Sequence, residues 1–204
     1  NIDFTAANYV RELNWWATYE MISLIAPEGS ATVVLTDVSM NMWPYWFYNS
    51  YGVYIYANLS VSASFTEFEL LNATNGISIE SLIGDVDLTM TNAMVSENVD
   101  NGILVYADDG ELNAVLEGVL VDHSYNGNGI VMQSMGDMSV TMTDVGVNDS
   151  AINGMLMLSV MGNVVLDLTN IDVANSGEDG MNVVSANGWI DVVIDPSSIS
   201  SSND

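Results

Sequence analysis

Carboxylate side chains beside recurring glycines are the residues whose types and spacing could bind an ion in this 204-residue sequence. The set comprises Asp85, Asp108, Asp109, Glu111 and Asp137. Oxygen ligands of this kind suit Ca²⁺, and two carboxylates across a cleft can hydrolyse a glycosidic bond. The sequence contains neither an EF-hand loop nor a GGxGxD nonapeptide, and a solvated acidic ridge explains the set equally well. We therefore predict no cofactor other than a candidate Ca²⁺ ion at these carboxylates, and no catalytic residue.

His123 is the single histidine of the chain and lies between Asp122 and Ser124. A Ser–His–Asp triad requires side chains that converge from separate parts of the sequence. Three consecutive residues at a strand end do not converge in that way, so His123 is predicted to be a surface residue. The chain has no cysteine, which excludes thiol catalysis, zinc–thiolate sites and disulfide bonds. The protein is therefore predicted not to be an enzyme.

The charge of the chain restricts its partners. Asp and Glu number 27 against a single Lys or Arg, which gives a formal net charge of −26 at pH 7. Such a surface repels nucleic acid and anionic membranes, and binding uronate carboxylates would require Lys or Arg. The sequence has no apolar run of about 18 residues or more, so no membrane insertion is predicted. The shortage of lysine and the abundance of aspartate favour an extracellular or cell-surface location.

Glycine residues recur at a nearly constant interval. One series comprises Gly52, Gly76, Gly102, Gly129, Gly154 and Gly180, with steps of 24, 26, 27, 25 and 26 residues. A second series comprises Gly29, Gly84, Gly110, Gly136, Gly162 and Gly188. An interval that is repeated in this many copies indicates an internal structural repeat.

Apolar and polar residues alternate after each glycine of the second series. In residues 86–91, Val86, Leu88 and Met90 alternate with Asp and Thr. A period of two indicates a strand with one buried face. Short strands are also predicted before and after this one, so each repeat carries three strands and three turns. A single repeat cannot bury its own apolar face, whereas a stack of repeats buries a continuous core.

Short side chains recur at two corners of the repeat. One position is occupied by Ala26, Ala57, Ser81, Ala107, Ser134, Ser159 and Ser185, and another by Asp37, Asn92, Asp144 and Asn170. The first set indicates a tight interior bend. The second set can bond to neighbouring backbone, and Asp and Asn tolerate left-handed backbone geometry.

The glycine turns, alternating strands and Thr-Asn corner, as in GDVDLTMTNAMVSENVDNG at residues 84–102, resemble the right-handed parallel β-helix repeat family. Pectate-lyase-like proteins and many surface adhesins have this architecture. We therefore predict an all-β, single-domain β-solenoid of about seven coils of about 26 residues, with three short parallel sheets. The right-handed winding is implied by the resemblance. The lyase chemistry of that family needs a basic residue over bound Ca²⁺, whereas Arg11, the only basic candidate, lies outside the repeats.

The repeat divides the chain into three parts. Residues 1–19 are predicted to form an incomplete first coil, residues 20–195 the parallel β-helix, and residues 196–204 a polar C-terminal tail. Residues 41–51 form an insertion that carries Trp43, Trp46 and Phe47. This insertion could fold over the outside of the solenoid, dock a partner, or stack against sugars.

The outward positions of the first strand in each coil are mostly apolar. Eight of them define what we call the apolar strip: Tyr54, Tyr56, Leu104, Tyr106, Val131, Leu156, Leu158 and Val184. Stacked coils bring these residues into one continuous patch at about 4.8 Å per coil. A large exposed apolar patch usually marks an interface.

Two functions fit this pattern. The first is an extracellular structural protein that assembles with itself into a filament, sheath or surface layer. Contacts between copies would use the apolar strip, the residues Trp43, Trp46 and Phe47, and the open solenoid ends. The alternative is a carbohydrate-binding or carbohydrate-active β-helix, such as an adhesin module, whose partner would be a glycan.

Overall fold

The computed structural model describes residues 2–13, 20–42 and 51–201, and all its regular elements in these ranges are strands. They are β1 (Ile2–Leu13), β2 (Glu20–Ala26), β3 (Ala31–Met42), β4 (Tyr51–Ala57), β5 (Val61–Leu71), β6 (Asn75–Ser81), β7 (Val86–Asn98), β8 (Ile103–Ala107), β9 (Leu112–Glu117), β10 (Leu120–Ser124), β11 (Ile130–Ser134), β12 (Met138–Ser150), β13 (Met155–Ser159), β14 (Val164–Ser176), β15 (Met181–Ser185), β16 (Ile190–Asp195) and β17 (Ser198–Ser201). The all-β prediction is confirmed. The part of the chain that the structure describes contains no apolar helix of membrane-spanning length.

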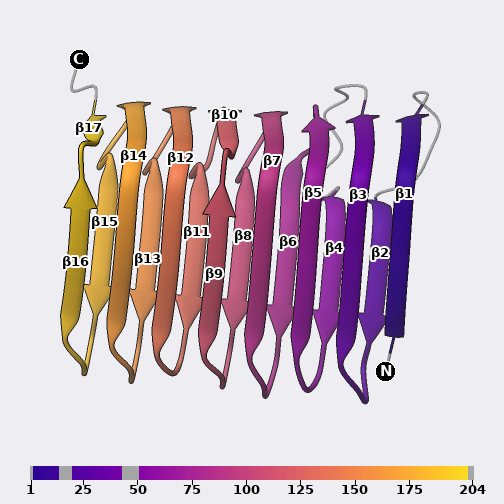
Figure 1. The fold of residues 1–204 in the computed structure, drawn as a ribbon, viewed down its shortest axis with the longest axis horizontal. Coiled ribbons are helices and arrows are strands. Elements are labelled where there is room, and N and C mark those ends of the chain that lie inside the picture. Colours follow the sequence, from indigo (N-terminus) through magenta and orange to yellow (C-terminus); the bar gives the residue numbers. More distant parts are fainter. Residues whose placement is uncertain (1, 14–19, 43–50, 202–204) are drawn as a thin grey trace.

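Two parallel sheets run along the molecule (Figure 1). The strands β2, β4, β6, β8, β11, β13 and β15 form a seven-stranded sheet, and the other ten strands form the second sheet. Each strand pairs with its counterparts in the neighbouring coils and not with the strand that follows it in sequence. The chain therefore winds as a β-solenoid of about seven turns with about 26 residues per turn, as predicted.

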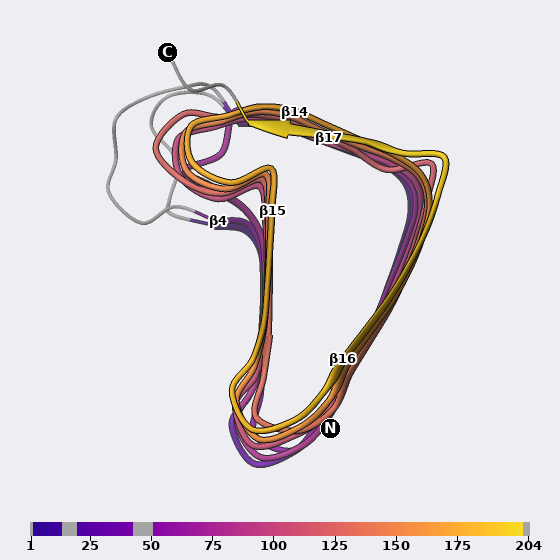
Figure 2. The same cartoon turned by 90° about the vertical axis from the view of Figure 1, so that its left-hand side faces the viewer.

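The coil is right-handed and has three straight sides (Figure 2). Seen from the C-terminal end, the chain passes down β15, up β16 and back along β17, anticlockwise as it approaches the viewer. One long strand forms two adjacent sides of a coil and bends at the corner between them. The 13-residue strands β7, β12 and β14 are examples. Where the bend falls at Gly118, it separates β9 from β10. The three strand segments of each coil are therefore present, but hydrogen bonding continues round this corner and joins two of them into one sheet.

Left-handed backbone produces the bend within the long strands. Asp37, Asn92, Asp144 and Asn170 have φ angles of 53°, 51°, 55° and 52°, which confirms the expectation for the Thr-Asn corner. A second left-handed column, which the sequence did not lead us to expect, consists of Asn72, Glu97, His123, Asp149 and Asn175. Left-handed geometry is uncommon outside glycine, and Asn, Asp and His are the residues enriched there. The second column marks the end of the third side of the coil.

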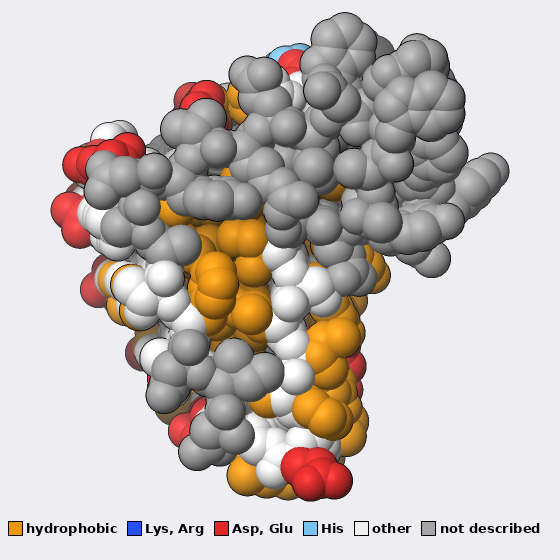
Figure 3. All heavy atoms as spheres, turned by 90° about the vertical axis from the view of Figure 1, so that its right-hand side faces the viewer, with side chains coloured by type: hydrophobic (Ala, Val, Ile, Leu, Met, Phe, Trp, Pro, Cys, Tyr) orange, Lys and Arg blue, Asp and Glu red, His pale blue; other side chains and the backbone are white. Residues whose placement is uncertain are grey.

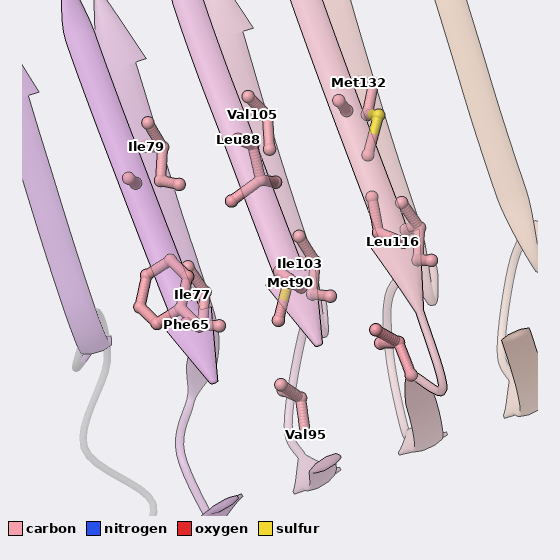
Figure 4. Close-up of a cluster of buried hydrophobic side chains, with 14 of the residues drawn as sticks. Phe65, Ile77, Ile79, Leu88, Met90, Val95, Ile103, Val105, Leu116 and Met132 are labelled. Carbon is pink, nitrogen blue, oxygen red and sulfur yellow. The ribbon is translucent and has the colours of Figure 1, made fainter. Parts of the chain in front are cut away.

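Apolar side chains from all three sides fill the solenoid. Phe65 and Phe68 flank the bend of β5, and their ring centroids lie 5.1 Å apart at an interplanar angle of 66°. Figure 4 shows Phe65 among Ile77, Ile79, Leu88, Met90, Val95, Ile103, Val105, Leu116 and Met132, all of them buried. Burial of one such Leu, Ile or Phe side chain contributes about 1.5–3 kcal/mol. Because neighbouring coils share this core, each coil depends on the next for its stability.

Side-chain hydrogen bonds follow the winding at the turns. Asn101 Oδ1 accepts hydrogen bonds from the backbone N (3.0 Å) and Nδ2 (3.1 Å) of Asn128. Asn128 Oδ1 accepts them from N (3.1 Å) and Nδ2 (2.9 Å) of Asn153. At the small-residue corner, Ser159 Oγ donates to the carbonyl of Gly136 in the preceding coil at 2.9 Å. Short polar side chains at these corners therefore bond to backbone groups of the neighbouring coil.

The C-terminal coil leaves the core open. Ile190, Val192 and Ile194 are 45%, 37% and 53% exposed, although they pair in register with Val164, Leu166 and Leu168, which are at most 1% exposed. The opposite end, which faces the viewer in Figure 3, also presents hydrophobic side chains. Both open ends therefore present apolar side chains, and β16 additionally presents an unpaired strand edge.

Substitution of Gly76 tests the close approach between coils. A Cβ at Gly76 would overlap the carbonyl oxygen of Gly102 and lie 2.6 Å from Cγ1 of Val95, whereas one at Gly146 would meet only Cδ1 of Leu120, at 3.1 Å. We expect Gly76→Ala to destabilise the fold by about 1–3 kcal/mol, and Gly146→Ala to change stability much less. Urea denaturation of both variants measures the difference. Equal stability of the two variants would contradict the packing described.

Candidate functional site

The outer face of the seven-stranded sheet carries the apolar strip in two straight rows. The pairing register stacks Tyr54, Ser78, Leu104, Val131, Leu156 and Asn182 in one row, and Tyr56, Glu80, Tyr106, Gln133, Leu158 and Val184 in the other. The sequence had placed all these side chains outward, and the register brings all eight residues of the strip onto one face. Its role as an interface stays a prediction.

The strip is partly covered. Val131 is 6% exposed and Val184 is 39% exposed, and the six other strip residues are half-buried. The turns that precede the strands of this sheet project on the side of its outer face (Figure 2). The strip therefore lies beside these turns and is exposed only in part.

A carboxylate interrupts the strip and forms a cluster with tyrosines. Burial raises the pKa of Glu80, Asp108 raises it further, and a hydrogen bond from Tyr54 opposes both effects. Burial also raises the pKa of Tyr106, with further contributions from Asp108, Glu80 and Tyr51. The rings of Tyr51 and Tyr54 lie 5.0 Å apart. Aromatic faces beside a carboxylate provide both a stacking surface and a hydrogen-bond acceptor.

Sequence reasoning did not select Glu80 as a functional residue. The available signal was an acidic side chain at a position where most other coils carry Ile, Tyr, Leu or Val. The other aromatic candidates, Trp43, Trp46 and Phe47, lie outside the described residues.

The predicted acidic ridge does not form a compact ligand set. Its residues Asp85, Asp108, Asp109, Glu111 and Asp137 are all exposed at the turns. Asp85 Oδ1 accepts the backbone N–H of Glu111 at 2.9 Å, and Asp137 Oδ1 accepts that of Asn163 at 2.7 Å. Two of the five carboxylates therefore link one turn to the next. Within the described ranges, three potential ligand atoms meet within 4.8 Å only at Asp122, His123 and Asp149.

His123 lies in a ring of carboxylates at the second left-handed corner. Its Nδ1 is 2.8 Å from Oδ2 of Asp122 and 3.9 Å from Oε1 of Glu97, and its Nε2 is 3.6 Å from Oδ2 of Asp149. Asp122 is the main cause that raises the pKa of His123; desolvation opposes it, and Glu97 and Asp149 raise it further. His123 is a surface residue, as predicted, with its side chain 38% exposed. Glu97 and Asp149 come from other coils, which explains why adjacent residues alone did not suggest the cluster.

A scan against protein-family models and searches of curated proteins and of solved structures find no match for this chain. The function is therefore inferred from the geometry of the chain itself.

Replacement of Glu80 tests the electrostatics of the strip. Because the pKa of Glu80 is raised in the folded state, the folded protein binds more protons than the unfolded chain between the two pKa values. Stability attributable to Glu80 therefore falls as pH rises through this window. We expect Glu80→Gln to raise Tm at pH 7 by at most about 2–4 °C, because solvent screening reduces the electrostatic effect of this partly exposed group.

Thermal unfolding at pH 4 and pH 7 measures this effect, with the exposed Glu178→Gln as the control. The advantage of Glu80→Gln should shrink at pH 4, where the wild-type carboxyl is protonated. A lower Tm at pH 7, or a gain that does not change with pH, would contradict the assignment.

Proposed function

We propose that this chain is an extracellular structural protein that assembles with copies of itself through the apolar strip. The proposal depends on one observation: two stacked rows of mostly apolar side chains lie on one face of a chain whose net charge is −26. Six of the eight strip residues are large Tyr or Leu side chains, which bury much area at a small entropic cost in an interface. The acidic remainder of the surface keeps other faces apart and solvated.

The open ends offer a second mode of contact. Ile190, Val192 and Ile194 at the C-terminal end are exposed core residues beside an unpaired strand edge. Such an edge is a template for pairing with another chain. Growth through the ends gives a filament, and contact through the strip joins filaments sideways into a sheath or surface layer.

The architecture supports an extracellular role at the cell surface. Right-handed winding and coils of about 26 residues agree with the right-handed parallel β-helix repeat family that the sequence resembles. Surface adhesins share that architecture. The family's lyase activity is not part of the proposal, because clamping an acidic polysaccharide requires basic side chains and the chain has one.

Carbohydrate binding is the second candidate function, and the tyrosine–carboxylate cluster favours it. The ring centroids of Tyr51 and Tyr54 lie 5.0 Å apart at an interplanar angle of 33°, and the Glu80 carboxylate accepts a hydrogen bond from Tyr54. Aromatic rings of this kind would bind the apolar face of a neutral sugar, and Glu80 its hydroxyl groups. An adhesin module would present this cluster to a glycan.

Self-assembly can be tested with residue types that already occur at the same position in an adjacent coil, because such substitutions are compatible with the fold. Leu104→Ser copies Ser78 and Leu156→Asn copies Asn182, each from the adjacent coil of the same row. The control Val115→Thr copies Thr89 and Thr141 on the other sheet, where Val115 is 47% exposed. Since one fully buried leucine contributes about 1.5–3 kcal/mol, we expect the double variant to weaken self-association by about a hundredfold or more.

Sedimentation at low and high salt, with electron microscopy of the same samples, measures the association. Wild type and Val115→Thr should assemble, and more so at high salt, where repulsion between acidic surfaces is screened. A wild-type protein that stays monomeric at high salt would overturn the proposal. A monomer that binds neutral glycans and loses binding in Tyr54→Ala would establish the second candidate instead.

A further inference from the structure

The second left-handed corner brings one histidine and three carboxylates together on the ten-stranded sheet, whereas the apolar strip lies on the seven-stranded sheet. Glu97, His123 and Asp149 occupy equivalent positions of β7, β10 and β12, with φ angles of 59°, 53° and 52°. Strands of adjacent coils lie about 4.8 Å apart, so the shared backbone geometry stacks these side chains above one another. Asp122 precedes His123 on β10 and adds a third carboxylate.

Hydrogen bonds orient two of the carboxylates toward the imidazole. Tyr125 donates a short hydrogen bond from its hydroxyl to Oε2 of Glu97, and Oε1 of Glu97 lies on the side of His123 Nδ1. Asn175 Nδ2 donates to Oδ1 of Asp149 at 3.0 Å, and Oδ2 of Asp149 lies on the side of His123 Nε2. In each carboxylate one oxygen is held and the other faces the ring. Outer partners of this kind are what orient the ligands of metal sites.

Both ring nitrogens of His123 face carboxylate oxygens. Nδ1 is shielded from solvent and lies 2.8 Å from Oδ2 of Asp122, but the contact lacks the alignment of a hydrogen bond. A metal ion takes one ring nitrogen of a histidine. Nδ1 lies 2.8 and 3.9 Å from oxygens of Asp122 and Glu97, and Nε2 lies 3.6 Å from an oxygen of Asp149, whereas ligand atoms around tetrahedral Zn²⁺ lie about 3.3 Å apart. One ligand atom each from Asp122, His123 and Asp149 lies within 4.8 Å of the other two.

We propose that one ring nitrogen of His123, with the carboxylates of Asp122 and Asp149, binds a divalent first-row transition metal ion of the Zn²⁺ class. Glu97 adds a further negative charge beside Nδ1. A mixed set of imidazole nitrogen and carboxylate oxygen suits Zn²⁺ and its neighbours in the first row, whereas Ca²⁺ takes oxygen ligands alone. The strongly acidic chain attracts cations to this site. Because Asp149 lies on the coil that follows the coil of Asp122 and His123, bound metal links adjacent coils at this corner.

Binding of Co²⁺ and Zn²⁺ to the chelator-treated protein tests the proposal. His123 is the only histidine of the chain, so all imidazole signals in a ¹⁵N NMR spectrum come from this residue. A shift of one ring-nitrogen signal on addition of Zn²⁺ identifies the nitrogen that binds the metal. We expect saturable binding of one Co²⁺ per chain with a visible absorption band, competition by Zn²⁺, a higher Tm, and no competition by equimolar Ca²⁺.

Matched variants distinguish metal binding at this site from non-specific attraction of cations to the acidic surface. His123→Asn places at the corner a residue that the same column already carries at Asn72 and Asn175, so the fold is retained while the imidazole is lost. We expect it to weaken Co²⁺ binding by about tenfold or more, and Asp149→Asn to weaken it less. The control Asp108→Asn, on the acidic ridge, should leave binding unchanged. Absence of binding at millimolar Co²⁺, or equal binding by wild type and His123→Asn, would overturn the proposal.

Discussion

Parallel hydrogen bonding between successive coils is the constraint on which the rest of this structure depends. Long strands meet their counterparts in the next coil in constant register, as Met138–Asn148 of β12 does with Val164–Ala174 of β14, whereas the pairing of β17 with β14 shifts after Val173. The register fixes which side chains face inward, because a slip of one residue would turn a whole strand inside out. The core, the turns and the outer rows are therefore consequences of one repeated pairing.

Because the register is fixed, residues that occupy the same position in successive repeats stack into a row along the molecule. An asparagine at the glycine turn becomes a ladder from Asn101 through Asn128 to Asn153, and an outward leucine becomes part of an apolar strip. The same rule places Glu97, His123 and Asp149 together, although they are 26 residues apart along the chain. A solenoid can therefore build a site from one residue per coil, and the charge and size of that residue can vary from coil to coil.

Much of this arrangement can be predicted from the sequence, because the alternation of apolar and polar residues and the spacing of the glycines both follow from the pairing of strands between coils. Val86, Leu88 and Met90 are inward as the period of two requires, and Asp37 and Asn92 bend the chain where short polar residues recur. The second left-handed column could not be predicted in the same way. Its residues Asn72, Glu97, His123, Asp149 and Asn175 differ in type, so no composition pattern marks the position. Contacts such as His123 with Asp149 depend on side-chain geometry across coils, which the register alone does not give.

The most direct test of the account is a disulfide engineered between adjacent coils. The chain has no native cysteine, and Thr141 and Asp167 are exposed register partners on β12 and β14. Paired strands bring such Cα atoms to about 4.8 Å, within the range that a disulfide spans. The monomeric Thr141→Cys/Asp167→Cys variant should close an internal disulfide on mild oxidation. The Thr141→Cys/Leu168→Cys variant should not, because its second cysteine faces the core. Closure in the second variant and not in the first would contradict the winding and everything built on it.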